Sequence, residues 1–237
     1  VFFMKAMILA AGRGERMRPL TDNCPKPLLK VNGIPLIEYH IKNLVAAGIT
    51  NIVINHAWLG QQLVDYLGCR KQFSAQISYS EEPVALETAG GIIKALPLLA
   101  EQDDEIFLVI NGDIYCDFDF NNLPPLSTKC SAHLMLIENP EHNSTGDFQI
   151  QAGMLANPKS NRQNTYTFSG IALYRKKFFQ QNTKKGEYQS LKQQQIVLPL
   201  APMLRAAAEQ KQVSACVMYS AWTDVGTPER LAKLNTI

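Results

Sequence analysis

Residues 6–21 have the sequence AMILAAGRGERMRPLT, in which a short apolar run changes into a loop that carries Gly12 and Gly14. The run Ala6–Ala11 predicts a fully buried strand. A glycine-rich loop directly after such a strand exposes backbone N–H groups that can bind phosphate. The same loop holds three arginines, Arg13, Arg16 and Arg18. A plain turn explains the glycines but not these cations, so the stretch predicts an anion-binding loop in an α/β fold.

Two common phosphate-binding motifs do not fit this loop. The dinucleotide fingerprint requires a third glycine, where Met17 stands, and an acidic residue at the end of the second strand, where Asn55 and His56 stand. The Walker A loop requires Gly-Lys followed by Ser or Thr, which this loop lacks. The loop therefore matches neither of these motifs.

The pattern on either side of this loop alternates between strands and helices. In the first half we predict strands at 51–55, 76–80 and 105–110, and helices at 35–48, 60–67 and 91–100. In the second half we predict strands at 131–138, 147–151, 165–174 and 213–219, helices at 199–210 and 227–234, and a variable loop at 151–164. This predicts a single α/β domain, residues 4–237, whose mixed sheet is flanked by helices. We expect the second half to form a more mixed sheet laid over the first.

Composition excludes several classes of protein. The 237 residues carry 23 Lys and Arg against 21 Asp and Glu, a net charge of +2 that gives no broad field for nucleic acid or an anionic membrane. Five scattered cysteines without C-x-x-C spacing favour free thiols over disulfides or zinc. No signal peptide is visible, and no apolar run approaches the roughly 20 residues that cross a bilayer. We expect a cytoplasmic protein, and the sequence leaves its oligomeric state open and compatible with a monomer.

Three further segments supply candidate charged groups. Lys26 lies between Pro25 and Pro27, which restrict the backbone and present the ammonium from a stiff segment. Asp113 follows a predicted strand in the segment Asn-Gly-Asp, and Asp224 follows another. Two carboxylates near a phosphate site are the minimal protein ligands for Mg²⁺, which takes its remaining ligands from water and substrate phosphates.

Four motifs together resemble the sugar-1-phosphate nucleotidyltransferases. They are LAAGRGERMRPLT at 9–21, PKPL at 25–28, NGD at 111–113 and TDVGT at 223–227, and they span the chain in the family's order. The resemblance implies a Rossmann-like sheet of the nucleotide-diphospho-sugar transferase type. It also implies transfer of a nucleotidyl group from a nucleoside triphosphate to a sugar 1-phosphate, with release of pyrophosphate. The nucleotide-binding half would be about 4–113 and the sugar-phosphate half about 114–237.

The resemblance also assigns site residues. Arg16, Lys26 and Asp113 are the expected catalytic residues, and Asp113 and Asp224 the expected ligands of Mg²⁺. The expected nucleotide-binding residues are Ala10, Ala11, Gly12, Arg13, Gly14, Lys26, Glu87, Thr88 and Gly90. The expected sugar-phosphate-binding residues are Asn111, Glu138, Asn139, Gly146, Asp147, Ser169 and Gly170. Arg18 is expected to be structural.

Further segments, among them LETAGGI at 86–92 and NPEHNSTGDF at 139–148, are similar to family members that use UTP and N-acetylmuramate 1-phosphate. Glu87 is compatible with either uracil or guanine, so GTP with mannose 1-phosphate is an alternative, and a choline-phosphate cytidylyltransferase a weaker one. The acidic pair Asp117 and Asp119 leaves a metal-dependent glycosyltransferase as an alternative of another class, and a non-catalytic nucleotide-binding regulator as a second. His142 either contacts the substrate or is an ordinary loop histidine.

Overall fold

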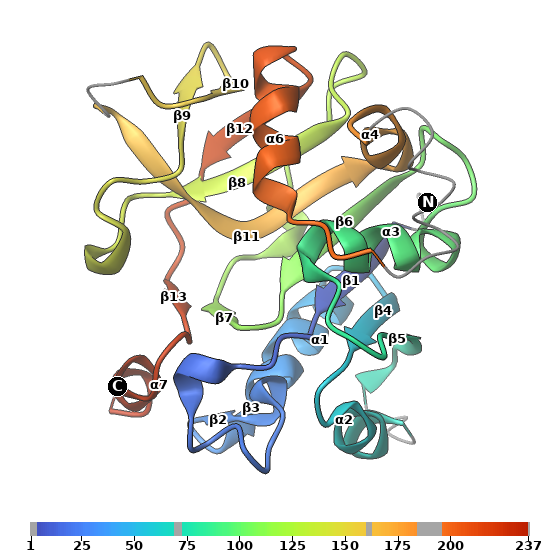
Figure 1. Cartoon of the computed structure of the whole chain (residues 1–237), viewed down its shortest axis with the longest axis vertical. Coiled ribbons are helices and arrows are strands. Elements are labelled where there is room, and N and C mark those ends of the chain that lie inside the picture. The colour runs from blue at the N-terminus through green and yellow to red at the C-terminus, as the bar shows by residue number, and fades with distance from the viewer. Residues whose placement is uncertain (1–3, 69–72, 160–162, 184–195, 237) are drawn as a thin grey trace.

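The architecture is organised by one mixed sheet, which the computed structural model describes together with its helices for residues 4–68, 73–159, 163–183 and 196–236 (Figure 1). Among these residues nine strands pair in the order β5-β4-β1-β6-β11-β8-β12-β10-β9. Their bounds are β1 Lys5–Leu9, β4 Asn51–His56, β5 Gln76–Glu81, β6 Ile106–Asn111, β8 Ala132–Ile137, β9 Phe148–Gln151, β10 Met154–Ala156, β11 Thr165–Arg175 and β12 Val213–Val217.

The first half of the chain forms the parallel part of the sheet. β1 lies between β4 and β6, with Met7 opposite both Val53 and Val109. Strands buried on both faces are continuously apolar, which is why the run in β1 is predictable. β11 then pairs antiparallel with β6 and with β8. The expectation that the second half lies over the first is therefore wrong, because its strands continue the same sheet edge to edge.

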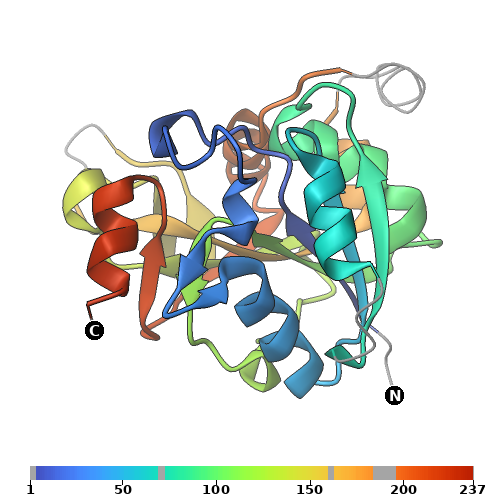
Figure 2. The same ribbon diagram turned by 90° about the horizontal axis from the view of Figure 1, so that it is seen from below.

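Helices cover both faces of the sheet (Figures 1 and 2). Their bounds are α1 Leu36–Ala46, α2 Gly60–Leu67, α3 Glu87–Leu99, α4 Lys176–Gln181, α6 Leu200–Glu209 and α7 Pro228–Leu234. Alternate residues of β1 enter different cores: Met7 packs with residues of α3, α4 and α6, whereas Ala6 and Ile8 pack with residues of α1 and α2. This alternation is the period-two geometry of a strand buried on both sides.

Short elements at the rim of the sheet position the loops. They are η1 Glu15–Met17, η2 Lys26–Leu28, β2 Lys30–Val31, β3 Ile34–Pro35, β7 Ile114–Cys116, η4 Phe120–Asn122, η5 Glu141–Asn143 and β13 Trp222–Asp224. β7 and β13 form a separate two-stranded ladder. Met17, Val225 and Leu231 share a small core that joins the glycine loop to β13 and α7. Strands of two or three residues carry too little periodicity to be predicted from sequence.

The start of α3 and the segment 151–164 both differ from the sequence prediction. α3 begins at Glu87 rather than 91, because the N–H groups of Ala89 and Gly90 donate to Leu198 O and stabilise a first turn that two glycines disfavour. The predicted loop at 151–164 contains β10, which pairs with β9 and β12. No helix in the described ranges combines the length and apolar character that a membrane span requires.

Candidate active site

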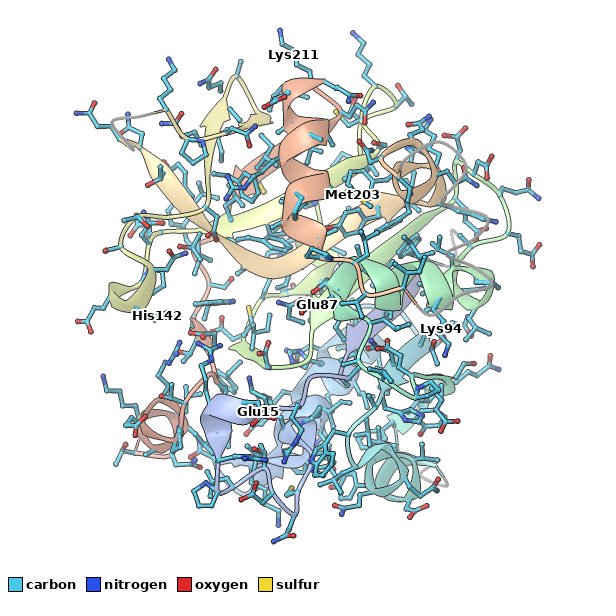
Figure 3. All side chains as sticks on the ribbon, in the orientation of Figure 1. Glu15, Glu87, Lys94, His142, Met203 and Lys211 are labelled. Atoms are coloured by element: carbon cyan, nitrogen blue, oxygen red, sulfur yellow. The ribbon has the colours of Figure 1, made fainter. Side chains whose placement is uncertain are left out.

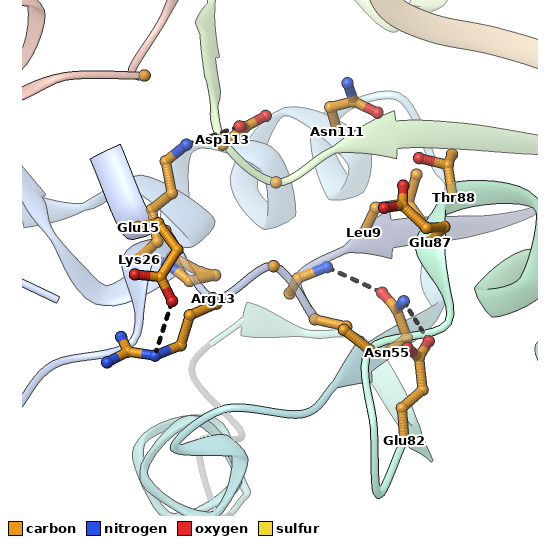
Figure 4. Close-up of a pocket in the computed structure, with 18 of the residues that line it drawn as sticks. Leu9, Arg13, Glu15, Lys26, Asn55, Glu82, Glu87, Thr88, Asn111 and Asp113 are labelled. Carbon is orange, nitrogen blue, oxygen red and sulfur yellow. Dashed lines mark hydrogen bonds and ion pairs between the residues drawn. The ribbon is translucent and has the colours of Figure 1, made fainter. Parts of the chain in front are cut away.

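A cleft of about 470 Å³ lies where β1, β4 and β6 end, within the usual range for a small-molecule site (Figure 4). Its lining residues are Leu9, Ala10, Ala11, Gly12, Arg13, Gly14, Glu15, Arg16, Lys26, Pro27, Asn55, Glu82, Ala85, Glu87, Thr88, Asn111, Gly112, Asp113 and Gly226. The structure thus brings the glycine loop, the Lys26 segment and the Asn-Gly-Asp turn to one place, as the sequence predicted for the carboxyl ends of parallel strands.

The glycine loop is held in an open conformation. Gly14 has φ +69°, and a Cβ there would lie 3.0 Å from the Thr21 side chain, whose hydroxyl donates to Gly14 O at 2.8 Å. Glycine is therefore required at this position. The N–H groups of Ala11 and Gly12 have no acceptor among the described residues. The Ala10 N–H is different, because it donates to Asn55 Oδ1 at 2.8 Å.

The three arginines of the loop have three different environments. Arg13 stacks 3.7 Å over the Trp58 ring and donates to Thr21 O at 2.9 Å, so it stabilises the loop while lining the cleft. Arg16 is exposed, lines the cleft, and has no ion pair or hydrogen bond within the described ranges. Arg18 lies outside the cleft and pairs with Glu15 and Asp22, at 3.3 and 3.1 Å. Arg16 alone of these three presents an unneutralised charge to the cleft.

Lys26 and Asp113 form an ion pair across the cleft. Lys26 lies on η2 and is 8% exposed, and its Nζ lies 2.7 Å from Asp113 Oδ2. Asp113 follows β6 after Gly112, whose N–H donates to Leu9 O at 2.8 Å. A Cβ at Gly112 would lie 2.5 Å from that same oxygen, so the close approach of the two strand ends requires glycine here. The pair places a cation and a carboxylate opposite the glycine loop.

Asp224 reaches the same edge through the β7/β13 ladder. Asp224 is opposite Ile114, and the Val225 N–H donates to Asp113 O at 2.7 Å. The Asp224 carboxylate contacts Arg230 and lies 2.8 Å from His142 Nε2. It is not among the residues that line the cleft.

These carboxylates fit the chemistry of Mg²⁺. Asp113 Oδ1 has no protein partner in the described part of the chain, while both Asp224 oxygens contact cationic groups. No group of three or more His, Cys, Asp and Glu side chains with metal-ligand spacing occurs among the described residues. Mg²⁺ commonly uses one or two carboxylates and completes its shell with water and substrate phosphates. The donor set therefore suits an ion that binds together with its substrate.

The start of α3 forms the opposite wall. Glu87 and Thr88 line the cleft, and Glu87 has φ +60° (Figure 3). Gly90 is buried outside the lining, and a Cβ there would lie 2.6 Å from Ile196 O. The structure gives Gly90 a packing role. Sequence reasoning missed Glu82, which lines the cleft directly after β5. The signal was the pair of carboxylates, Glu81 and Glu82, that follows the predicted strand 76–80 at the same sheet edge.

On the predicted sugar side, Asn111 lines the cleft and is positioned by Gly170. Gly170 has φ +84°, and a Cβ there would lie 2.7 Å from Asn111 Cγ. Ser169 is fully buried, and its hydroxyl donates to Met135 O at 2.7 Å and accepts from the Ile171 N–H at 3.1 Å. The pairing of β11 with β8 shifts register at this point, so Ser169 and Gly170 form a bulge that re-aims the strand.

The other predicted sugar residues lie on the loop between β8 and β9, outside the cleft lining. The Asn139 amide donates to Thr165 at 3.1 Å and accepts from Thr167 Oγ1 at 2.9 Å. Asp147 accepts from the Phe168 N–H at 2.9 Å. Gly146 has φ +61°, and a Cβ there would lie 2.6 Å from Asn139 Oδ1. These residues form a hydrogen-bonded framework, whereas Glu138 is exposed.

His40 and His133 are two of the three buried histidines, the third being His56. Burial lowers the pKa of His40 from 6.5 to about 4, against the opposing effects of a hydrogen bond to the Ile114 backbone and the charge of Asp113. Burial also lowers the pKa of His133, which contacts Ser214 Oγ at 2.8 Å. Both are packed, as the sequence indicated, and His40 supports β7 immediately after Asp113.

The chain is similar to known proteins over nearly its whole length. The family model described as "Nucleotidyl transferase" matches residues 5–237. An N-acetylmuramate alpha-1-phosphate uridylyltransferase from Neisseria meningitidis serogroup B is 48% identical over 99% of this chain and 98% of its own length. A mannose-1-phosphate guanyltransferase from Gibberella zeae is 40% identical over 51% of this chain and 33% of its own length.

A solved structure shows the fold independently of sequence. The structure described as a proposed glucose-1-phosphate thymidylyltransferase from Bacillus anthracis, in complex with a sucrose, aligns with a TM-score of 0.80 at 24% identity. The alignment covers 98% of this chain and 94% of that one. The mixed α/β sheet predicted from the sequence is thereby confirmed.

Proposed function

The chain belongs to the nucleotidyl transferase family, and from that premise we propose that it transfers a uridylyl group from UTP to N-acetylmuramate α-1-phosphate, releasing pyrophosphate. The observation that carries the chemistry is the cleft in which unpaired loop N–H groups face the Lys26–Asp113 pair. The near full-length similarity to the N. meningitidis uridylyltransferase supports this pair of substrates. We place the reaction in the cytoplasmic reuse of cell-wall sugars.

In the proposed reaction, an oxygen of the sugar phosphate attacks the α-phosphorus of UTP. The bond between that phosphorus and the bridging oxygen to the β-phosphorus breaks, and pyrophosphate leaves with the electron pair. No covalent enzyme intermediate is required, so positioning and charge stabilisation supply most of the rate. The N–H groups of Ala11 and Gly12 would bind the triphosphate, and the unpaired Arg16 would neutralise charge on the departing pyrophosphate. Lys26 would bridge the α-phosphate and the sugar phosphate.

The proposed Mg²⁺ ligands are Asp113 and Asp224. When bound, the ion screens the repulsion between the two anionic substrates. Asp113 is already beside Lys26, so this carboxylate can keep the ammonium oriented while it also contacts the metal. Asp224 would have to exchange contacts with Arg230 and His142 for a metal contact.

We further propose that residues 4–113 hold the nucleotide and residues 114–237 the sugar phosphate. Glu87 and Thr88 lie at the base side of the cleft, and Asn111 lies where the two halves meet. His142 is the candidate partner for the lactyl carboxylate that distinguishes N-acetylmuramate, because it is exposed on η5 beside Asp224. Asn139, Asp147 and Ser169 would shape the sugar side without contacting the sugar.

A matrix of the four nucleoside triphosphates against several sugar 1-phosphates, measured as pyrophosphate released, tests this proposal. We expect kcat/KM with UTP and N-acetylmuramate 1-phosphate to exceed that with N-acetylglucosamine 1-phosphate by at least about tenfold, or about 1.4 kcal/mol. A fixed donor left unpaired by the smaller sugar would account for this difference. His142→Ala should reduce the ratio of the kcat/KM values for the two sugar phosphates. Equal values for the two sugars, or a preference for GTP with mannose 1-phosphate, would overturn the substrate assignment.

A further inference from the structure

A buried chain of hydrogen bonds crosses the floor of the cleft (Figure 4). The Ala10 N–H donates to Asn55 Oδ1 at 2.8 Å, and Asn55 Nδ2 donates to Glu82 Oε1 at 2.7 Å. Glu82 Oε2 accepts from the Leu86 N–H at 2.9 Å. We refer to Asn55 and Glu82 together as the Asn55–Glu82 relay. It joins the loop after β1 to the residue before α3.

The relay is buried and tightly enclosed. Asn55 is 3% exposed and Glu82 is 2% exposed, yet both line the cleft. The two side chains fit against α3 only because residue 91 is glycine. A Cβ at Gly91 would lie 2.6 Å from Glu82 Oε1 and 2.8 Å from Asn55 Nδ2. Buried polar groups in such a network are costly to leave unpaired, so each contact constrains the next.

The relay has a fixed polarity. A carboxylate accepts hydrogen bonds and does not donate them, so Glu82 can face Asn55 only through the Asn55 amide nitrogen. That choice turns Asn55 Oδ1 toward Ala10, where it accepts the backbone N–H. The orientation of the Ala10 peptide, and with it the start of the glycine loop, is thus determined by a side chain at the end of β5.

We propose that Asn55 and Glu82 are positioning residues that hold the phosphate-binding loop and the base-side start of α3 in one fixed relation, so that the two ends of a nucleotide are bound as a unit. This inference rests on the proposed function insofar as the ligand is a nucleoside triphosphate. It assigns no contact between the relay and the reacting atoms. It predicts that UTP binding depends on complete pairing of donors and acceptors in the relay, rather than on which of the two residues carries the amide.

The test exchanges the two functional groups. Glu82→Gln leaves one N–H unpaired whichever way the amides turn, because the chain then has more donors than acceptors. Asn55→Asp puts two carboxylates against each other. The double variant Asn55→Asp with Glu82→Gln restores all three hydrogen bonds with reversed side-chain polarity and the same net charge. Glu81→Gln changes the adjacent exposed carboxylate of β5 and serves as the matched control.

UTP affinity is measured by calorimetry on each folded variant, with KM for the sugar 1-phosphate and the free energy of unfolding measured alongside. Each single variant of the relay should weaken UTP binding about tenfold or more, consistent with one unpaired buried group, with the KM for the sugar phosphate nearly unchanged. The double variant should recover UTP affinity to within about threefold of wild type, as expected for two directly coupled residues. Glu81→Gln should bind UTP like wild type.

Several outcomes would overturn the inference. UTP affinity in Glu82→Gln equal to wild type would show that the relay does not position the nucleotide. A double variant that binds UTP no better than the single variants would show that pairing within the relay does not control UTP affinity. Equal weakening for both substrates would indicate a general structural defect. A wild-type chain that binds no UTP at all would overturn the proposed function, and with it the role assigned to the relay.

Discussion

The proposed nucleotide side and the proposed sugar side of the molecule use polar residues in opposite ways. Around the glycine loop, Arg16 and the N–H groups of Ala11 and Gly12 have no partners in the described part of the chain. On the loop after β8, Asn139 and Asp147 are occupied by contacts with neighbouring backbone and hydroxyl groups. One region keeps its polar groups available for a ligand, whereas the other uses them to hold its own backbone.

The difference follows from the elements that carry the two regions. The glycine loop leaves a strand held between two neighbours, so the sheet and the Asn55 side chain fix its start, and the contacts of Arg13 and Thr21 hold the rest of its backbone. The loop after β8 runs for ten residues between strands, 138–147, and its backbone groups need partners that side chains must supply. A polar residue that matches a binding position of the family is therefore not, on that ground alone, in contact with a ligand.

The largest effect should come from the metal and phosphate edge. Asp113→Asn should lower kcat by about 10³-fold, because the amide can still accept from Lys26 but cannot neutralise a divalent cation. Asp224→Asn should also lower kcat by orders of magnitude. Steady-state kinetics at saturating Mg²⁺, with thermal unfolding as the folding control, measures both. Near-wild-type turnover in either variant would remove that residue from the proposed metal site.

The arginines of the glycine loop provide a matched pair within the nucleotide side. Arg16→Ala should lower kcat/KM by about 10²-fold, the effect expected when one preorganised charge stabiliser is lost. Arg18→Ala should change it by less than about threefold, since its partners Glu15 and Asp22 are exposed surface groups. Pyrophosphate release by the two variants under identical conditions tests this. Equal losses would show that net loop charge, rather than the position of Arg16, matters.

The buried histidine beneath β7 adds a pH dependence of stability to the nucleotide side. His40 has a pKa of about 4 when folded, below the value of 6.5 for an unburied histidine. Between these values the unfolded chain binds a proton that the folded chain does not, so stability falls as the pH drops from 6.5 toward 4. From pH 7 to pH 5 this group should cost about 2 kcal/mol of unfolding free energy.

Urea unfolding of wild type and His40→Gln at the two pH values checks this prediction. The variant should lose less stability on acidification, because glutamine does not titrate. If wild type and His40→Gln lose the same unfolding free energy between pH 7 and pH 5, the acid sensitivity belongs to other groups.

The smallest effect on catalysis should come from the framework of the sugar side. Ser169→Ala should reduce the unfolding free energy by about 1–3 kcal/mol, because Met135 O and the Ile171 N–H lose a buried partner. Its kcat/KM for the sugar phosphate should stay within about threefold of wild type. Ser144→Ala, an exposed serine on the neighbouring loop, should change neither quantity. A large selective rise in KM for the sugar phosphate would make Ser169 a ligand contact and weaken the comparison.

Much of the fold was predictable because local pattern and burial agree. β1, β4 and β6 contain continuous apolar runs, and α2 has the predicted bounds 60–67. The short ladder of β7 and β13 was not predictable, since three residues define no period. The pairing of β11 with β6, which joins the two halves of the sheet, was also not predictable, because the sequence of a strand does not specify which strand it pairs with.

The sequence by itself determined the chemistry of the nucleotide side: a glycine loop with arginines, a lysine between prolines and a carboxylate after a strand, all dictated by backbone sterics and by the needs of phosphate. Only the tertiary structure decided which polar groups remain free. Arg16 and Arg18 are alike in sequence and separated by two positions, yet one faces the cleft and the other pairs at the surface. Asn55, Glu82 and Ala10 are far apart in the chain and acquire a role together because parallel strands end at one edge of the sheet. A residue's partners depend on long-range packing, and packing is what a local pattern does not contain.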